Sequence, residues 1–374
     1  TKEYNFLQYC LFVTFFPQLI AGPIVHHKRM MPQFAKGVLE KLKLENLADG
    51  ITTFTIGLFK KVVLAHNIAF FATPGFNAAE HGFNLTFFEA WGAALAYTFQ
   101  LYFDFSGYSD MAVGLGLMFG IALPINFLSP FKTKNISEFW RCWHISLSKF
   151  IRDYLYYPIS LSLTRYVLNK NLGNIGIFTL GIFIPTMFAF FLAGLWHGPA
   201  WHFVLFGLLH GTYIVIYNIW IKIISMIPED KRIKKNNITN FIGRFITFTA
   251  VIFSLVIFRA ETIDGASNII ESMLGMNGIE FTDMFQIGVF GALPKTGIAW
   301  IILSLLIVNF LPNTQQFILN QSKVFINWGD ATLNELNQKI KWKPTSYWGI
   351  FFAIMLTVSV ISFSGTSEFL YFSF

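Results

Sequence analysis

The chain contains few charged residues for its length. Of its 374 residues only 13% are charged, while 54% are apolar and 18% are aromatic. Soluble domains carry about 25% charged residues, so this composition argues against a water-soluble fold. Apolar runs close to the length of a bilayer crossing recur from end to end. We therefore expect an all-α, polytopic integral membrane protein in which residues 1–374 form one membrane-embedded domain.

Patterns that would bind a metal or build a disulfide framework are also scarce. Cys10 and Cys142 are the only cysteines, and both stand in apolar surroundings, so neither a disulfide framework nor a cysteine metal site is predicted. No HExxH or similar metal spacing exists among His197, His202 and His210. We predict no bound metal.

The first residues lack the marks of a signal peptide. The apolar segment Phe6–Ile20 has neither a charged start nor a small-residue cleavage site, and Thr1 stands where an initiator Met would be. We expect the chain to be a fragment. An internal repeat is not visible, so the two-halves plan common in secondary transporters is not indicated.

Apolar runs predict nine segments that cross or enter the membrane. Pro and Gly-Pro positions interrupt or end several of them, because Pro lacks a backbone donor and restricts the residue before it. Such breaks at membrane depth require a protein-lined cavity. The segments are Phe6–Ile20, Ile51–Phe71, Phe87–Phe103, Gly107–Leu123, Ile175–Leu195, Trp201–Ile221, Phe241–Phe258, Ile298–Leu311 and Trp348–Phe363.

The charge of the loops predicts their side of the membrane. Lys and Arg outnumber Asp and Glu by 27 to 20, and in membrane proteins such an excess lies in cytoplasmic loops against anionic lipids rather than on nucleic acid. Ile221–Arg244, Asn313–Lys343 and Lys28–Lys61 are basic and are expected to be cytoplasmic. Arg259–Lys295 is acidic and is expected outside, as is the tail Ser364–Phe374.

Asp104 and Asp110 form the first group of ionisable residues within apolar sequence. Such a residue costs about 2.5–3.5 kcal/mol at the centre of a membrane helix unless it has a partner or faces a cavity. We favour a polar turn that joins two apolar runs and caps the next helix, with a direct chemical role as the alternative. Lys60 and Lys61 likewise fall within an apolar segment.

The second group is a periodic stripe of polar and basic residues. Glu138, Arg141, His144, Ser148 and Arg152 recur at intervals of three or four, so on one helix they share a face. Arginine forks suit phosphate, and Arg141, Arg152 and Ser148 are candidates to hold the phosphates of an acyl carrier such as coenzyme A, with Asp153 holding one guanidinium. An interfacial helix resting on anionic head groups explains the stripe equally well.

The third group surrounds His197, which precedes a Gly-Pro break between two apolar runs. A lone histidine in an apolar run is usually a packing residue. The break requires an open backbone, however, and an unperturbed imidazole titrates near about pH 6.5, so it can take a proton from a hydroxyl and return it to a leaving group.

Several long motifs, in the same order, resemble those of the membrane-bound O-acyltransferase family, and within it the bacterial alginate and peptidoglycan O-acetyltransferases. The resemblance covers nearly all of the chain. Members of this family usually carry further transmembrane helices before the point where this chain begins, so the resemblance implies that N-terminal helices are missing. It implies a funnel-shaped helical bundle with a central tunnel, in which His197 serves the acyl transfer and His144 is the second functional histidine. The motifs are Phe16–Ile24, Tyr102–Ala112, Asn126–Phe127, Ser137–His144, Arg152–Pro158 and Gly194–Gly198.

The aromatic C-terminus also resembles a motif of related acyl-transfer systems, in which a tyrosine, Tyr371 here, is proposed to carry the acyl group. An interfacial aromatic anchor is the alternative. The resemblance implies a multi-pass protein of the bacterial inner membrane that transfers acetyl groups from cytosolic acetyl-CoA to an extracytoplasmic hydroxyl. A periplasmic or extracellular transferase then acetylates a polysaccharide. A transporter of an acyl or lipid-linked intermediate and a membrane anchor for a secreted transferase are the competing hypotheses.

Overall fold

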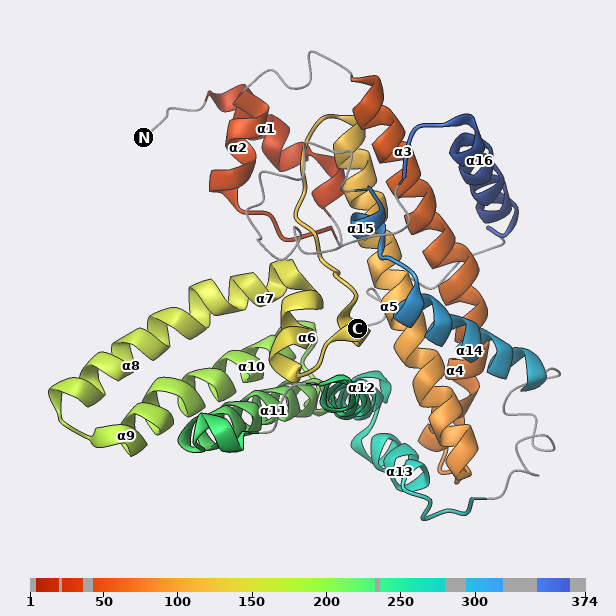
Figure 1. Cartoon of the computed structure of the whole chain (residues 1–374). Helices are drawn as coiled ribbons and strands as arrows, with labels where there is room; N and C mark the ends of the chain where they lie inside the picture. Colours follow the sequence, from red (N-terminus) through yellow and green to blue (C-terminus); the bar gives the residue numbers. More distant parts are fainter. Residues whose placement is uncertain are drawn as a thin grey trace. The chain divides into compact units, whose positions relative to one another are not determined.

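The computed structural model of the chain describes residues 5–19, 22–35, 43–232, 236–279, 294–318 and 342–363 (Figure 1). Across these ranges every regular element is helical and no strand is present, which confirms the predicted all-α class. The tail Ser364–Phe374, which includes Tyr371, lies outside the described residues, as does most of the predicted loop Asn313–Lys343.

The helices include several π-helical and 3₁₀ turns. In chain order they are α1 (Phe6–Thr14), η1 (Phe16–Gln18), α2 (His27–Ala35), α3 (Leu44–Phe59), η3 (Lys60–Ala65), α4 (His66–Glu80), α5 (Phe87–Met118), η4 (Pro130–Lys132), α6 (Ile136–Cys142), α7 (Ile145–Ile151), η5 (Arg152–Tyr156), α8 (Tyr157–Asn169), α9 (Gly173–Gly176), η6 (Ile177–Phe183), α10 (Ile184–His197), α11 (Trp201–Met226), η7 (Glu229–Lys231), α12 (Asn237–Arg259), α13 (Ile263–Met273), α14 (Pro294–Phe310), α15 (Thr314–Ile318) and α16 (Ser346–Ile361).

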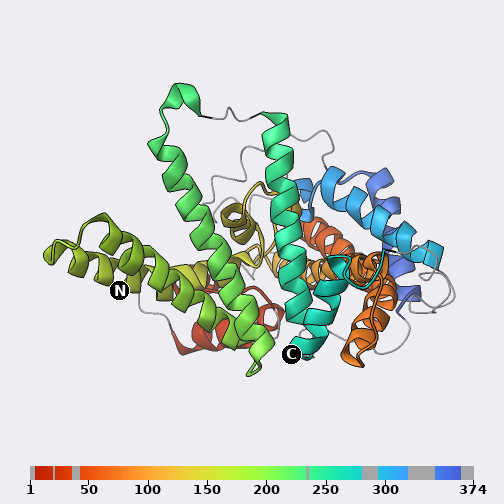
Figure 2. The same ribbon diagram turned by 90° about the horizontal axis from the view of Figure 1, so that it is seen from below.

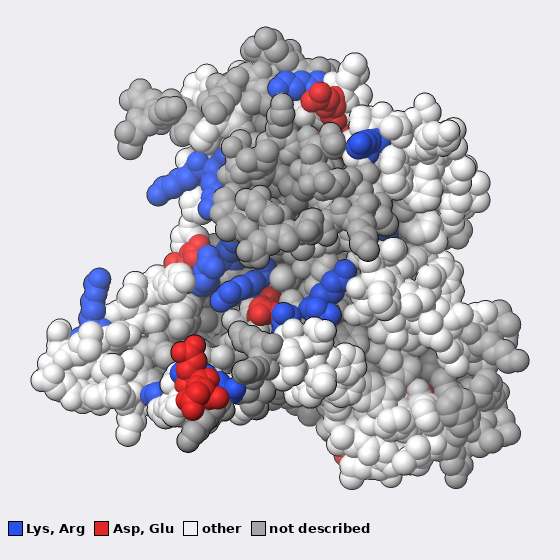
Figure 3. Space-filling model, viewed as in Figure 1, with Lys and Arg blue, Asp and Glu red and all other residues white. Residues whose placement is uncertain are grey.

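Several helices are long and apolar enough to cross a bilayer. In Figure 3 the Lys, Arg, Asp and Glu side chains gather in a few places, and most of the other described residues on this face are uncharged. The chain is therefore a membrane protein with several passes. Its candidate spans are Leu44–Glu80, Gly173–His197, Trp201–Met226 and Asn237–Arg259, and the shorter apolar helices are Thr296–Phe310 and Ser346–Ile361.

Two of the predicted segments, Phe87–Phe103 and Gly107–Leu123, are one helix. The 32-residue α5 runs without interruption from Phe87 to Met118. Asp104 and Asp110 consequently lie inside this helix, and the interpretation of this region as a polar turn that caps a helix is wrong. The first predicted span is also shorter than expected, because α1 ends at Thr14.

The described helices form two compact units. The first unit comprises Thr1–Ile68, Phe99–Ser129 and Ser304–Ser373, and the second comprises Ala69–Thr98 and Pro130–Leu303. All the candidate site histidines belong to the second unit. The first unit contains the ion pairs of Lys60 with Asp110 and of Lys61 with Asp104.

Glycines bring α3 and α5 into close contact in the first unit. A Cβ atom at Gly57 would lie 2.5 Å from the carbonyl oxygen of Gly107, and one at Gly107 would lie 2.6 Å from that of Gly57. The contact repeats two turns away, where a Cβ at Gly50 would lie 2.7 Å from the Gly114 oxygen. Small residues permit such close backbone packing between membrane helices.

The two lysines within apolar sequence form ion pairs with the two aspartates of α5. Lys60 Nζ donates to Asp110 Oδ2 at 2.7 Å, and Lys61 pairs with Asp104. Both lysines begin the π-helical turn η3, and their ammonium groups reach two aspartates of the same helix, α5. The pairs remove the cost of four isolated charges at membrane depth.

Asp110 also anchors α15 within the first unit. The Thr314 hydroxyl donates to Asp110 Oδ2 at 2.6 Å, and the Gln315 side-chain amide donates to Oδ1 at 2.6 Å. Lys60 Nζ additionally donates to Thr314 Oγ1 at 2.8 Å. One carboxylate therefore joins three helices that are distant in sequence.

In the second unit α10, α11 and α12 pack in sequence order. Figure 2 shows that α11 and α12 are far apart where α11 ends and α12 begins, and that they approach each other toward their opposite ends. Their convergent ends are held by the Phe206 and Phe258 rings, whose centroids are 4.8 Å apart. At the α10–α11 contact, a Cβ at Gly207 would lie 2.2 Å from the Phe190 carbonyl oxygen.

Gly207→Ala is expected to destabilise the protein, because the added methyl group meets backbone of α10 and must separate the two helices. We expect a lower midpoint of thermal unfolding in detergent. Gly349→Ala is the matched control, since nothing lies within 4 Å of a Cβ at this position of α16 and alanine favours helix. Equal midpoints for both variants would contradict the close contact.

Candidate functional site

His197 is the last residue of α10, at the break predicted from the sequence. α10 ends at the Gly198 cap and α11 begins at Trp201. A Cβ at residue 198 would lie 2.6 Å from the Phe203 ring, so only glycine lets that ring approach the turn. The break therefore fixes His197 at the junction of two membrane helices.

Aromatic rings surround the His197 imidazole. The ring centroids of Trp196 and Phe258 lie 5.0 Å from it, and those of Phe206 and Phe203 lie 6.0 Å and 6.2 Å away. The residue as a whole is partly exposed. The imidazole is thus held in place by packing against four aromatic rings.

His144 lies close to Trp196, with ring centroids 6.2 Å apart. The side chain of His144 is 5% exposed, and burial, with a smaller contribution from the charge of His197, lowers its pKa. His144 is therefore a neutral imidazole near neutral pH. The indole of Trp196 contacts both histidine rings.

The backbone at His144 has φ 42° and ψ 54°, the left-handed conformation that non-glycine residues rarely adopt. It separates α6, which ends at Cys142, from α7, which begins at Ile145. Backbone strain of this kind is concentrated at functional sites. The predicted single helical stripe through His144 is consequently wrong: Glu138 and Arg141 lie on a different helix from Ser148.

The three residues predicted to hold phosphates are placed as follows. Arg141 is exposed in the last turn of α6. The Ser148 hydroxyl donates to the Trp143 carbonyl oxygen at 3.2 Å, and Arg152 Nε pairs with Asp153 at 2.9 Å, as the sequence suggested for that carboxylate. Their role in binding an acyl donor stays a prediction.

Two cations that are distant in sequence, Lys132 and Arg244, lie close together, which sequence reasoning missed. Burial and the nearby charge of Arg244 lower the pKa of Lys132. The same two segments meet where a Cβ at Gly243 would lie 2.6 Å from the Lys134 carbonyl oxygen. No local pattern could reveal this group, because η4 and α12 are more than a hundred residues apart.

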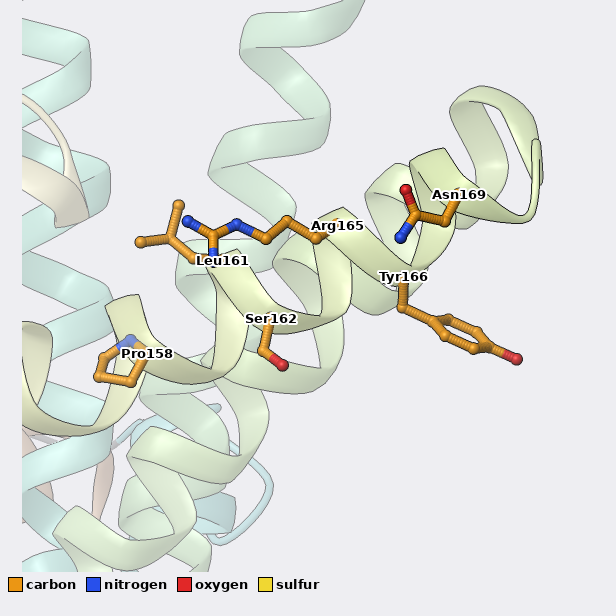
Figure 4. A pocket seen from close by; sticks show the side chains of 6 residues that line it. All are labelled: Pro158, Leu161, Ser162, Arg165, Tyr166 and Asn169. Carbon is orange, nitrogen blue, oxygen red and sulfur yellow. The ribbon is translucent and has the colours of Figure 1, made fainter.

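A shallow groove follows the outer face of α8 (Figure 4). All its lining residues belong to this one helix, and none is a candidate catalytic residue. The opposite face of α8 packs on η6, where the Ser160 hydroxyl donates to the Gly181 oxygen at 2.5 Å. The groove is lined by Pro158, Leu161, Ser162, Arg165, Tyr166 and Asn169.

Comparisons with known proteins agree with these features. The family described as "MBOAT, membrane-bound O-acyltransferase family" matches residues 1–258. A peptidoglycan O-acetyltransferase of Helicobacter pylori is 44% identical over 275 residues, which are 74% of this chain and 48% of the relative. A probable alginate O-acetylase AlgI of Azotobacter vinelandii is 38% identical over 75% of this chain and 50% of its own length.

A more distant relative is named for a different activity. The teichoic acid D-alanyltransferase of Bacillus subtilis is 32% identical over 67% of this chain and 60% of its own length. The chain thus spans about half the length of the first two relatives.

Proposed function

Because the chain belongs to the membrane-bound O-acyltransferase family, we propose that it transfers an acetyl group from cytosolic acetyl-CoA to a hydroxyl on the outer side of the bacterial inner membrane. The final acceptor is a polysaccharide such as peptidoglycan or alginate, a proposal supported by the activities for which two relatives are named. The observation that best supports this proposal is the position of His197. The residue is partly exposed and surrounded by aromatic side chains, at the junction where one membrane helix ends and the next begins.

His197 is the general base of the proposed reaction. It takes the proton of the acceptor hydroxyl, whose oxygen attacks the thioester carbonyl carbon. The new C–O bond forms as the C–S bond breaks, and the proton passes from the imidazolium to the departing thiolate. A thioester is more activated than the oxygen ester formed, so the reaction needs no further energy source.

The neighbouring residues bind and orient the reactants. Arg141, Arg152 and Ser148 are proposed to hold the phosphates of coenzyme A, with arginine forks suited to phosphate oxygens. The neutral His144, packed against Trp196 beside His197, is proposed to orient the reacting groups by hydrogen bonding. The surrounding rings limit the access of water, which would hydrolyse the thioester.

Tyr371 is proposed to be the first acceptor. Its hydroxyl belongs to the tail expected on the outer side, and a periplasmic or extracellular transferase would pass the acetyl group on to the polysaccharide. The chemistry would then cross the membrane without transport of acetyl-CoA.

Transfer from labelled acetyl-CoA tests whether Tyr371 is the first acceptor of the acetyl group. It is supplied to the purified protein in liposomes without a polysaccharide or partner, and the label on the polypeptide is located by proteolysis and mass spectrometry. Label on Tyr371 of the wild type, and none on Tyr371→Phe, is the expected result. Equal labelling of Tyr371→Phe would refute the role of the tail and leave the acyltransferase activity intact.

A further inference from the structure

The hairpin formed by α8, α9 and η6 belongs to a long stretch of sequence that has cations but no carboxylate. From Tyr154 to Pro228 the sequence contains no Asp or Glu. Its Lys and Arg residues are Arg165, Lys170 and Lys222, and all three are exposed. Exposed apolar side chains beside cations are typical of a segment at the membrane interface. The exposed apolar residues of the hairpin include Leu161, Leu168, Leu172 and Ile175.

The hairpin also lies beside a helix end that we expect on the cytoplasmic side. Lys222, near the end of α11, has its Nζ 5.9 Å from the centroid of the Phe178 ring of η6. The basic loop that we expect in the cytoplasm follows this end of α11. Within the hairpin, a Cβ at Gly181 would lie 2.6 Å from Thr164 Oγ1, so Thr164 faces η6 within about one turn of Phe178. The next residue, Arg165, is therefore expected at the level of the anionic head groups of the cytoplasmic leaflet.

The groove on α8 combines one guanidinium with neutral hydrogen-bond donors and an apolar margin. Its lining residues recur at intervals of one and three and therefore share one face of the helix. Figure 4 shows the Arg165 side chain running back along α8 toward Leu161. Within the described part of the chain, no side-chain hydrogen bond or ion pair engages the polar groups of this groove, which belong to Ser162, Arg165, Tyr166 and Asn169.

We propose that this groove binds the head group of an anionic phospholipid of the cytoplasmic leaflet. The Arg165 guanidinium donates to the phosphodiester oxygens, because its planar fork matches them. The Ser162 hydroxyl and the Asn169 amide donate to the remaining phosphate and glycerol oxygens. The Tyr166 ring, apolar with a polar tip, suits the boundary between head groups and acyl chains.

The charge and the margin of the groove favour a lipid over a soluble anion. Arg165 is the one charged residue among those that line it. One cation matches the single negative charge of a phosphodiester, whereas coenzyme A carries several phosphate charges. Leu161 and Pro158 offer apolar surface to the first methylene groups of an acyl chain, which a soluble phosphate lacks. The inference concerns binding alone and does not depend on the proposed acetyl transfer.

Binding of phosphatidylglycerol to the purified full chain in detergent tests the inference, with bound lipid counted by native mass spectrometry and zwitterionic phosphatidylcholine as the reference. We expect the wild type to prefer phosphatidylglycerol and Arg165→Ala to bind it about tenfold more weakly, because a charge-assisted contact is lost. Arg165→Lys keeps the charge without the fork and should fall between the two. Lys28→Ala, which removes an exposed cation from another segment expected to be cytoplasmic, is the matched control and should bind like the wild type.

Unchanged binding of phosphatidylglycerol by Arg165→Ala would overturn the inference. An equal loss in Lys28→Ala would overturn it too, because binding would then follow the net charge of the protein rather than the groove. Displacement of the bound lipid by coenzyme A or by inorganic phosphate would assign the groove to a soluble anion, which also contradicts the inference. Thermal midpoints of the variants verify folding, and they should match the wild type because Arg165 and Lys28 are exposed.

Discussion

His197→Ala is expected to lower the rate of acetyl transfer by at least about 10²-fold, the lower end of what general base catalysis contributes. The imidazole stands where α10 ends, in a residue that is partly exposed, and alanine leaves no group there to accept the hydroxyl proton. The measurement is the initial rate of label transfer from acetyl-CoA in liposomes, at protein levels confirmed by immunoblot and with a thermal midpoint close to that of the wild type.

His202→Ala is the control for this experiment. His202 also lies beside Phe203, with ring centroids 4.1 Å apart, but stands on α11 beyond the break and has no proposed role. Its replacement should leave the rate near that of the wild type. Persistent transfer by a folded His197→Ala variant would instead favour a transporter or an anchor for another transferase, because neither function needs this imidazole.

The sequence predicted the membrane helices of the second unit well because their signals are local. Long apolar runs define α10, α11 and α12, and the Gly-Pro break at the end of α10 was visible without any tertiary information. The prediction failed for α5. Asp104 and Asp110 suggested a turn, since their partners Lys61 and Lys60 lie 43 and 50 residues away and no local pattern pairs them.

The site was predicted in part. The location of His197 at a helix end followed from glycine and proline chemistry. The break at His144 did not, because a histidine there adopts a left-handed backbone that normally calls for glycine, and no Gly or Pro marks it.

Lys60→Met is expected to lower the free energy of unfolding by about 3–5 kcal/mol, because it leaves the buried Asp110 carboxylate without its cation. The side chains of Lys60 and Asp110 are 13% and 2% exposed, so water screens the pair little. The same carboxylate accepts hydrogen bonds from Thr314 and Gln315, and the loss therefore extends to the anchoring of α15. Denaturant titration in detergent micelles measures the effect.

Two further variants separate the effect of the buried charge on stability from the effect of losing side-chain contacts. Lys60→Met combined with Asp110→Leu removes both charges and is expected to recover much of the stability, since a buried pair replaced by apolar residues is often neutral or better. Arg152→Ala breaks the exposed Arg152–Asp153 pair, whose side chains are 46% and 51% exposed, and should cost at most about 1 kcal/mol. A double variant no more stable than Lys60→Met would show that the hydrogen bonds of Asp110 to α15, rather than its charge, dominate the stability of this unit.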